Sequence, residues 1–351
     1  MRIIGIDPGT HSFDFFGVEG TKVILDFSVS SEDVAQNPNI ILDTVKSILP
    51  LDMIVGPSGY GLPLTHIGDI TDRELALMIP LDESVPVNEG IRGVVKLMKA
   101  EGLPVYFTPG VIHLPTVPAY RKANKMDMGT ADKVCCVVLA IKDEAEYLGI
   151  DYNETCFILT ELGYGFNAVI GVEGGKIVDG AGGTSGGPGF LTLGAMDSEL
   201  AMRLGGFPQI VLFSGGAKDM SGKDDLSPEE MAKEQHKYSQ SWNMMVESVV
   251  KGVAAMMVSV GKPREILLSG RLSGIPEIAE TMREKLAHFG PVRKVRRRAR
   301  VAKEAAEGAY IIGEGLLSGQ YKGIIDCLEL RGASGTMFDH IRLKGIELEK
   351  P

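Results

Sequence analysis

Several features that mark large classes of proteins are scarce in this chain of 351 residues. It has only four cysteines, and no two of them stand at C-x-x-C spacing, which argues against a zinc or iron–sulfur site. Cys135 and Cys136 lie in an apolar run and are expected to pack as small core residues. The longest apolar runs fall well short of a membrane span, and nothing at the N-terminus resembles a signal peptide. These absences predict a soluble, cytoplasmic protein.

Basic residues are outnumbered by acidic ones, 36 to 46. The formal net charge of −10 argues against a nucleic-acid surface as the main function. One basic run, 293–300, is an exception: we expect a solvated strand edge there, with phosphate or RNA contact as the alternative. The length suits two domains, and the 44 glycines suggest many places where backbone approaches a ligand or another element closely.

The chain opens on a hairpin pattern, RIIGIDPGTHSFDFFGV. Its β-branched residues predict a strand, the Pro8-Gly9 pair predicts a tight turn, and the second apolar run predicts the returning strand. The predicted tip carries Asp7, Gly9, Thr10, His11 and Ser12. Glycine lets backbone N–H groups approach a phosphate, and a nearby carboxylate can hold Mg²⁺ through water. From this stretch alone, an ordinary tight hairpin is the alternative.

The pattern of elements that follows the hairpin occurs twice. In the first half we expect further strands at 21–29, 51–55 and 104–108 and helices at 38–49 and 91–100. A bridging helix begins at residue 130. In the second half we expect strands at 154–160, 166–172, 176–178, 265–268 and 292–295, and helices at 197–204, about 228–260, 276–288 and 301 to about 317. The fold class is therefore α/β, with two domains of one topology, each a mixed sheet flanked by helices.

This ordered set resembles the acetate and sugar kinase, Hsp70 and actin superfamily. The features that carry the resemblance are the two glycine-tipped hairpins, the linking helix, the SGRLSG turn within 266–274 and the closing helix rich in small residues. The resemblance implies two ribonuclease H-like (actin-like ATPase) domains, 1–125 with 305–351 and 126–304. It also implies an ATP cleft between them, with ATP and Mg²⁺ as cofactors.

Candidate roles for particular residues follow from the same resemblance. The hairpins and the SGRLSG turn would bind the nucleotide through Gly9, Thr10, His11 and Ser12, through Gly163, Tyr164, Gly165 and Asn167, and through Ser269, Gly270, Arg271 and Gly274. Asp7 and Glu304 would hold Mg²⁺. Small residues at 129–131 and 305–309 would let two interdomain helices cross closely at a hinge.

The second hairpin bears on the phosphoryl acceptor. It carries Glu161 where acetate and butyrate kinases have histidine, and the whole chain looks most like an uncharacterised, largely archaeal family of predicted butyrate kinases. That resemblance implies phosphoryl transfer to a small carboxylate, which is already ionised and needs no general base. Arg121 is the candidate cation for the transferring group, and Asp7, Glu161 and Asp127 are the other candidate catalytic residues. Asp127 and Lys133 would replace the missing histidines locally.

Two alternatives remain open. One is a kinase of a small hydroxyl compound with Glu161 or Asp127 as general base, and the other is an ATP-gated switch that acts on a protein partner. The expected partner is a small-molecule carboxylate, without nucleic acid or membrane, and a homodimer is compatible with the sequence.

Overall fold

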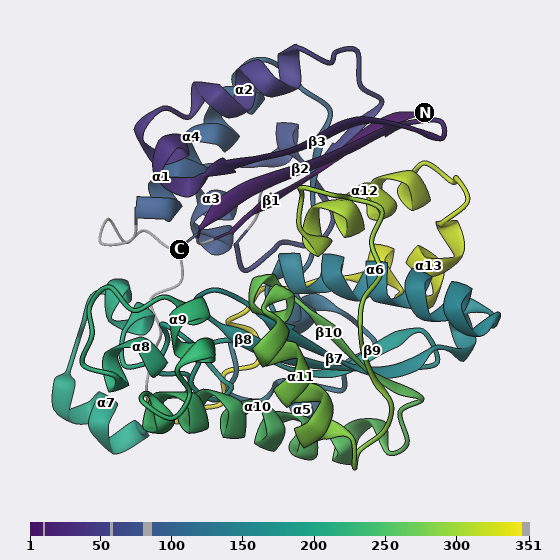
Figure 1. Cartoon of the computed structure of the whole chain (residues 1–351). Helices are drawn as coiled ribbons and strands as arrows, with labels where there is room; N and C mark the ends of the chain where they lie inside the picture. The colour runs from purple at the N-terminus through teal and green to yellow at the C-terminus, as the bar shows by residue number, and fades with distance from the viewer. Residues whose placement is uncertain (10, 57–58, 80–85, 346–351) are drawn as a thin grey trace.

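The computed structural model describes residues 1–9, 11–56, 59–79 and 86–345. Figure 1 shows two layered halves, each built on a sheet, with helices α6 and α12 lying between the two sheets. The first sheet has the strand order β3-β2-β1-β4-β6-β5. Its strands are β1 (Arg2–Pro8), β2 (Ser12–Glu19), β3 (Lys22–Ser30), β4 (Met53–Val55), β5 (Thr65–His66) and β6 (Val105–Phe107). β1 pairs antiparallel with β2 and parallel with β4. The sheet therefore combines an antiparallel meander with parallel strands joined by crossover connections, as predicted.

The second sheet repeats this arrangement with the order β9-β8-β7-β10-β11. Its strands are β7 (Cys156–Leu162), β8 (Asn167–Glu173), β9 (Lys176–Ala181), β10 (Glu265–Ser269) and β11 (Val292–Lys294). The repeat extends to an irregularity in the pairing, which falls between Gly17 and Val18 in β2 and between Gly171 and Val172 in β8. The predicted duplication of one topology is confirmed.

Helices cover both sheets. In the first half they are α1 (Ser31–Gln36), α2 (Asn39–Lys46), α3 (Asp72–Met78), α4 (Pro86–Ala100) and α5 (Ala119–Lys122), with single turns at η1 (Ile67–Asp69) and η2 (Val111–His113). In the second half they are α6 (Ala131–Leu148), α7 (Ser198–Leu204), α8 (Ala217–Met220), α9 (Pro228–Lys233), α10 (Ser239–Val260) and α11 (Pro276–Leu286), with turns at η3 (Tyr152–Glu154), η4 (Gln209–Phe213) and η5 (Arg271–Gly274). The C-terminal part adds α12 (Glu304–Leu316), α13 (Lys322–Cys327) and η6 (Leu330–Gly332).

Helices α6 and α12 cross at very short range. A Cβ atom at Gly308 of α12 would lie 1.9 Å from the carbonyl oxygen of Cys135 in α6, so only glycine fits there. On its other side α12 packs on β1, where a Cβ atom at Gly5 would lie 2.2 Å from the carbonyl oxygen of Ala306. The predicted close crossing is confirmed on the α12 side at Gly308, but its contact in α6 is the Cys135 backbone rather than the small residues at 129–131, and Gly129 lies against Val111 and Ile170 instead. The exact domain boundaries stay a prediction.

The long helix predicted at about 228–260 is wrong as a single element. It is divided into α9 and α10 by turns at 234–238, where neither proline nor glycine marks the break. Among the described residues, α10 is one helix that could cross a membrane by length and composition, contrary to the expectation from the sequence. This is weak evidence for a span, because core helices pass the same test, and α10 buries Trp242, Val249 and Val253 against the second sheet.

The basic run 293–300 forms ion pairs and hydrogen bonds with other parts of the chain, in addition to lying at the edge of the second sheet. Arg293 and Arg296 both contact the carboxylate of Asp143, whose side chain is 2% exposed, and Arg293 also binds Glu265 at 2.7 Å. Arg297 donates to a backbone carbonyl oxygen at Ala302. The run therefore joins the edge strand β11 to α6 and to the start of α12, and the predicted solvated edge is only part of its role.

The close crossing predicts that replacing Gly308 by alanine destabilises the protein. Gly308→Ala should lower the free energy of unfolding by about 1–3 kcal/mol through overpacking, although alanine favours helix by about 1 kcal/mol. Gly90→Ala in α4 is the matched control, because its Cβ atom would meet nothing closer than 3.4 Å and should be neutral or stabilising. Urea unfolding of the two variants measures the difference, and equal stabilities would contradict the crossing geometry.

Candidate functional site

The two hairpin tips have the same geometry and face one another. The Gly9 N–H donates to the Ser12 carbonyl oxygen at 2.9 Å, and the Gly163 N–H donates to the Phe166 carbonyl oxygen at 3.0 Å. In each hairpin the acidic residue stands one position before the end of the first strand, as Asp7 in β1 and Glu161 in β7. The rings of His11 and Tyr164 lie 5.1 Å apart, which brings the tips together across the interdomain cleft.

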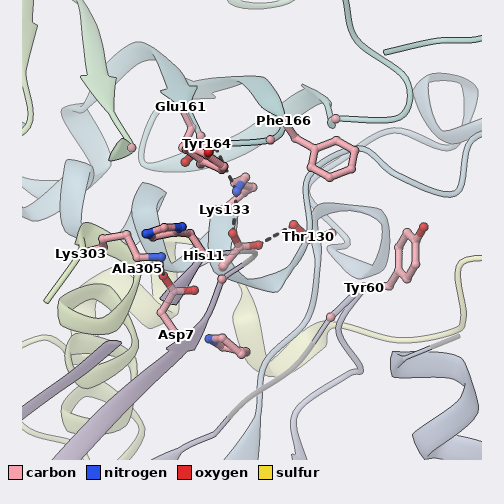
Figure 2. Close-up of a pocket in the computed structure, with 18 of the residues that line it drawn as sticks. Asp7, His11, Tyr60, Thr130, Lys133, Glu161, Tyr164, Phe166, Lys303 and Ala305 are labelled. Atoms are coloured by element: carbon pink, nitrogen blue, oxygen red, sulfur yellow. Dashed lines mark hydrogen bonds and ion pairs between the residues drawn. The ribbon is translucent and has the colours of Figure 1, made fainter. Parts of the chain in front are cut away.

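A cavity of about 220 Å³ lies between these tips. Of the site residues predicted from the sequence, its walls contain Asp7, Gly9, His11, Ser12, Asp127, Glu161, Gly163, Tyr164, Gly165, Gly270, Arg271 and Glu304. Figure 2 shows Asp7 and Lys303 at one end of the cavity, Lys133 near the middle, and Tyr60 and Phe166 at the other end.

The structure does not bring four other predicted residues to the cavity walls. Arg121 lies at β9 instead, where its guanidinium donates to the Val178 carbonyl oxygen at 2.7 Å and stands 3.8 Å from Asp179. This placement corrects the expectation that Arg121 faces the transferring group, because α5 runs beside the edge of the second sheet. Asn167, Ser269 and Gly274 also lie outside the cavity walls, and Thr10 lies outside the described residues.

At the first hairpin, Lys303 holds two buried carboxylates. Its ammonium group lies 3.1 Å from Asp7 and 3.1 Å from Asp14, and the Ser12 hydroxyl donates to Asp14 at 2.8 Å. Burial raises the pKa of Asp7 to about 6, although Lys303 opposes the shift. The pKa of Lys303 is itself raised, because the attraction of Asp7 and Asp14 outweighs the effect of burial. The Oδ1 atom of Asp7 has no hydrogen-bond partner among the described residues.

At the second hairpin, Lys133 plays the corresponding part. Its ammonium group lies 3.0 Å from Glu161 and 2.6 Å from Asp132, as the dashed lines in Figure 2 mark for the residues drawn. Burial raises the pKa of Glu161, in spite of Lys133. Burial also opposes ionisation of Asp132, but Lys133 and the Thr130 hydroxyl outweigh it and lower its pKa. Each hairpin therefore presents a buried carboxylate paired with a lysine.

The charges at the site are not balanced. Four carboxylates and two ammonium groups make up the two clusters, which leaves a net charge of −2 when all are ionised. No group of three or more His, Cys, Asp or Glu in the described ranges is arranged to hold a metal ion. The excess of carboxylate charge fits Mg²⁺, which keeps several waters and binds through one or two carboxylates together with phosphate oxygens. The unpartnered Oδ1 atom of Asp7 is the protein group most suited to it.

Two more acidic residues line the cavity. Asp127 accepts hydrogen bonds from the N–H of Gly129 at 2.9 Å and from both the N–H and the hydroxyl of Thr184 at 3.1 Å. These bonds join the start of α6 to the loop after β9, so Asp127 is a clamp between segments. Glu304 is 3% exposed at the start of α12, with Oε1 3.9 Å from Nε of Arg297.

Donor groups for an anion converge on the same cavity. The N-terminal residues of both α6 and α12 line it, and the N-cap residue of neither helix makes a side-chain capping hydrogen bond. The free N–H groups in the first turn of a helix without a side-chain cap favour the binding of an anion. Gly270, at a φ of +84°, starts the predicted adenosine turn, and the guanidinium of Arg271 lies 5.8 Å from the ring centre of Tyr164.

Sequence reasoning missed Lys303 and gave Lys133 a smaller part than the geometry does. Lys303 stands 296 residues after Asp7 in the chain, so no local spacing connects them. A usable signal was present: Lys303 directly precedes the closing helix, as Thr130 directly precedes the bridging helix. Because the two halves repeat one topology, the starts of these two helices are expected at the same cavity, which would have placed Lys303 there.

A family model described as "Protein of unknown function (DUF1464)" matches residues 5–343. The chain belongs to this family. No curated protein matches the chain. The family description carries no butyrate-kinase name, so the closer resemblance to predicted butyrate kinases stays a prediction.

Solved structures give the fold. The chain is similar to an acetate kinase from Entamoeba histolytica, at 12% identity over 82% of this chain and 87% of that one, with a TM-score of 0.61. A propionate kinase from Francisella tularensis subsp. tularensis SCHU S4 has 16% identity over 86% and 98% of the chains, with a TM-score of 0.62. A ROK family protein from Streptococcus pneumoniae TIGR4, in complex with sucrose, has 16% identity over 90% and 100%, with a TM-score of 0.52. The predicted two-domain fold is confirmed.

The raised pKa of Asp7 predicts that this residue lowers the free energy of unfolding at high pH. Its ordinary value is 3.8 and its folded value is about 6, so the folded state binds the proton more tightly. The free energy of unfolding contributed by this group therefore falls as pH rises from about 4 through 6. Asp7→Asn carries no charge and should be more stable than the unaltered chain at pH 8, by on the order of 1–3 kcal/mol, with a smaller gain at pH 5.

Urea unfolding at the two pH values measures this effect. Asp225→Asn is the control, because that side chain is 85% exposed and should give no comparable difference. A loss of stability in Asp7→Asn at pH 8 would contradict the account.

Proposed function

We propose that this chain catalyses ATP-dependent phosphoryl transfer to a small carboxylate, with an acyl phosphate as product. The observation that carries the proposal is the pair of buried carboxylate–lysine contacts, Asp7 with Lys303 and Glu161 with Lys133, which face one cavity between two glycine hairpins. The fold shared with acetate and propionate kinases supports it.

The chemistry suits a carboxylate acceptor. Such a substrate is ionised at neutral pH and attacks without a general base, so catalysis consists of alignment and charge neutralisation. The hairpin N–H groups and the starts of α6 and α12 would hold phosphate oxygens. Lys133 and Lys303 would neutralise charge at the transferring group, each held in place by two carboxylates.

Mg²⁺ fits the site through Asp7, with Glu304 as a second candidate, and when bound it supplies neutralisation of phosphate charge. The protein's part is to keep Asp7 ionised and oriented, which Lys303 does at 3.1 Å. Protonation of Asp7 near pH 6 would remove this ligand.

Hydroxylamine trapping tests the reaction. With ATP, Mg²⁺ and short carboxylic acids, the full chain should form a hydroxamate in step with ADP. Lys133→Met should lower kcat by about 10²–10³-fold while the affinity for the nucleotide changes little, because the lost contact acts in the transition state. Lys142→Met, on the same helix but paired with Glu146, is the control. If no acid yields hydroxamate, the acyl-kinase proposal is wrong.

One observation favours a second function, a kinase of a small hydroxyl compound. The pKa of Glu161 is raised by burial, which would make it a better general base, whereas the oxygens of Asp127 are occupied by its clamp hydrogen bonds. Glu161→Gln separates the two functions. A hydroxyl acceptor should lose about 10²–10⁴-fold in kcat without its base.

With a carboxylate acceptor, the same variant should retain turnover within about tenfold, because Glu161 then only positions Lys133. The second arm is the acceptor panel: sugars and polyols should stimulate ADP release only if the hydroxyl function is correct. A large loss in Glu161→Gln together with sugar-dependent ADP release would replace the carboxylate proposal.

A further inference from the structure

The end of the cavity remote from Asp7 has a different character. Tyr60 and Phe166 lie at this end (Figure 2), and together with the other apolar wall residues Met78, Ile91, Leu212 and Phe213 we call them the apolar lobe. Phe166 and Phe213 pack edge to face with ring centres 4.9 Å apart. Figure 2 shows Tyr60 and Phe166 on the side of the cavity opposite Asp7 and Lys303. The lobe draws on both halves of the chain, since α3 and α4 supply one wall and η4 supplies the other.

The polar side chains around the apolar lobe are bonded to one another. The Asn88 amide donates to the Gln209 side-chain oxygen at 2.9 Å, across the two halves, and the Tyr60 hydroxyl bonds with Gln209. Nearer the charged end, the hydroxyl of Thr130 donates to Asp132 and the hydroxyl of Thr184 donates to Asp127. A hydroxyl-rich ligand would have to compete with these bonds for the same side chains.

We infer that the apolar lobe binds the tail of the acceptor, and that this tail is bulky and free of hydroxyl groups, either a branched alkyl chain or an aromatic ring. The inference rests on the proposed function, because the acceptor's carboxylate must lie at the charged end beside Lys133. Apolar walls bind such a tail by removing both surfaces from water, and they discriminate weakly among apolar shapes. Acetate leaves the lobe unfilled, and a sugar would place its hydroxyl groups against walls that are mostly carbon.

Binding and turnover are measured separately on the full chain. Calorimetry with Mg²⁺ and ADP present uses phenylacetate, 3-methylbutyrate, acetate, gluconate and glucose as probes. The first two should bind at least about tenfold more tightly than acetate, and gluconate and glucose should bind no better than acetate. A preference between phenylacetate and 3-methylbutyrate then distinguishes the aromatic tail from the branched one.

A pair of variants locates the binding. Phe213→Ala should weaken the two apolar acids about tenfold while acetate and ADP change little. Ile210→Ala, in the same η4 turn but outside the cavity walls and 42% exposed, should leave all affinities unchanged. None of the residues of η4 is buried, so the exchange at Phe213 should leave folding intact.

The outcomes separate this inference from the proposed function. Tight binding of the apolar acids without hydroxamate would support the lobe assignment and contradict the acyl-kinase reaction. Hydroxamate from acetate alone, or equal binding of acetate and the apolar acids, would overturn the lobe assignment and leave the reaction intact. Tighter binding of gluconate or glucose, or no binding of any acid, would also overturn the lobe assignment.

Discussion

The close crossing of α6 and α12 is the constraint on which the site depends. Gly308 lies against the backbone of Cys135 about one turn into each helix, so the first turns of both helices reach the same cavity. Lys133 lies in the first turn of α6 and Lys303 directly precedes α12, so both lysines come from these helix starts. A wider crossing would separate the two lysines and the two helix N-termini that the hairpins need.

Duplication followed by divergence explains the arrangement of charges. The same hairpin position carries Asp7 in one half and Glu161 in the other, and each is met by a lysine that a helix start supplies. The two carboxylates are paired with different lysines, but burial raises the pKa of both. The lysines reach the two carboxylates differently: Lys303 lies 3.1 Å from Oδ2 of Asp7 and leaves Oδ1 without a hydrogen-bond partner among the described residues, whereas Lys133 lies 3.0 Å from Oε2 of Glu161.

The sequence predicted what short-range patterns determine. Both hairpins and the small residues of the closing helix can be read from short stretches of the chain, and all are present. The side-chain contacts between distant segments escaped prediction. Arg121 lies beside β9 because of how α5 packs, Lys303 reaches Asp7 through the tertiary fold, and the end of α9 near Glu234 has no proline or glycine to mark it. The hydrogen bond between Asn88 and Gln209, which links the two halves beside the apolar lobe, connects residues 121 positions apart.

The central claim is that the two hairpins and their lysines form one phosphoryl-transfer site. A crystal structure of the full chain with ADP, Mg²⁺ and aluminium fluoride tests it most directly, because aluminium fluoride imitates the transferring phosphoryl group. The account predicts the fluoride group between the ammonium groups of Lys133 and Lys303, with Mg²⁺ near Asp7 and the ADP phosphates on the glycine tips of both hairpins. Nucleotide bound elsewhere, or a fluoride group that contacts neither lysine, would contradict it.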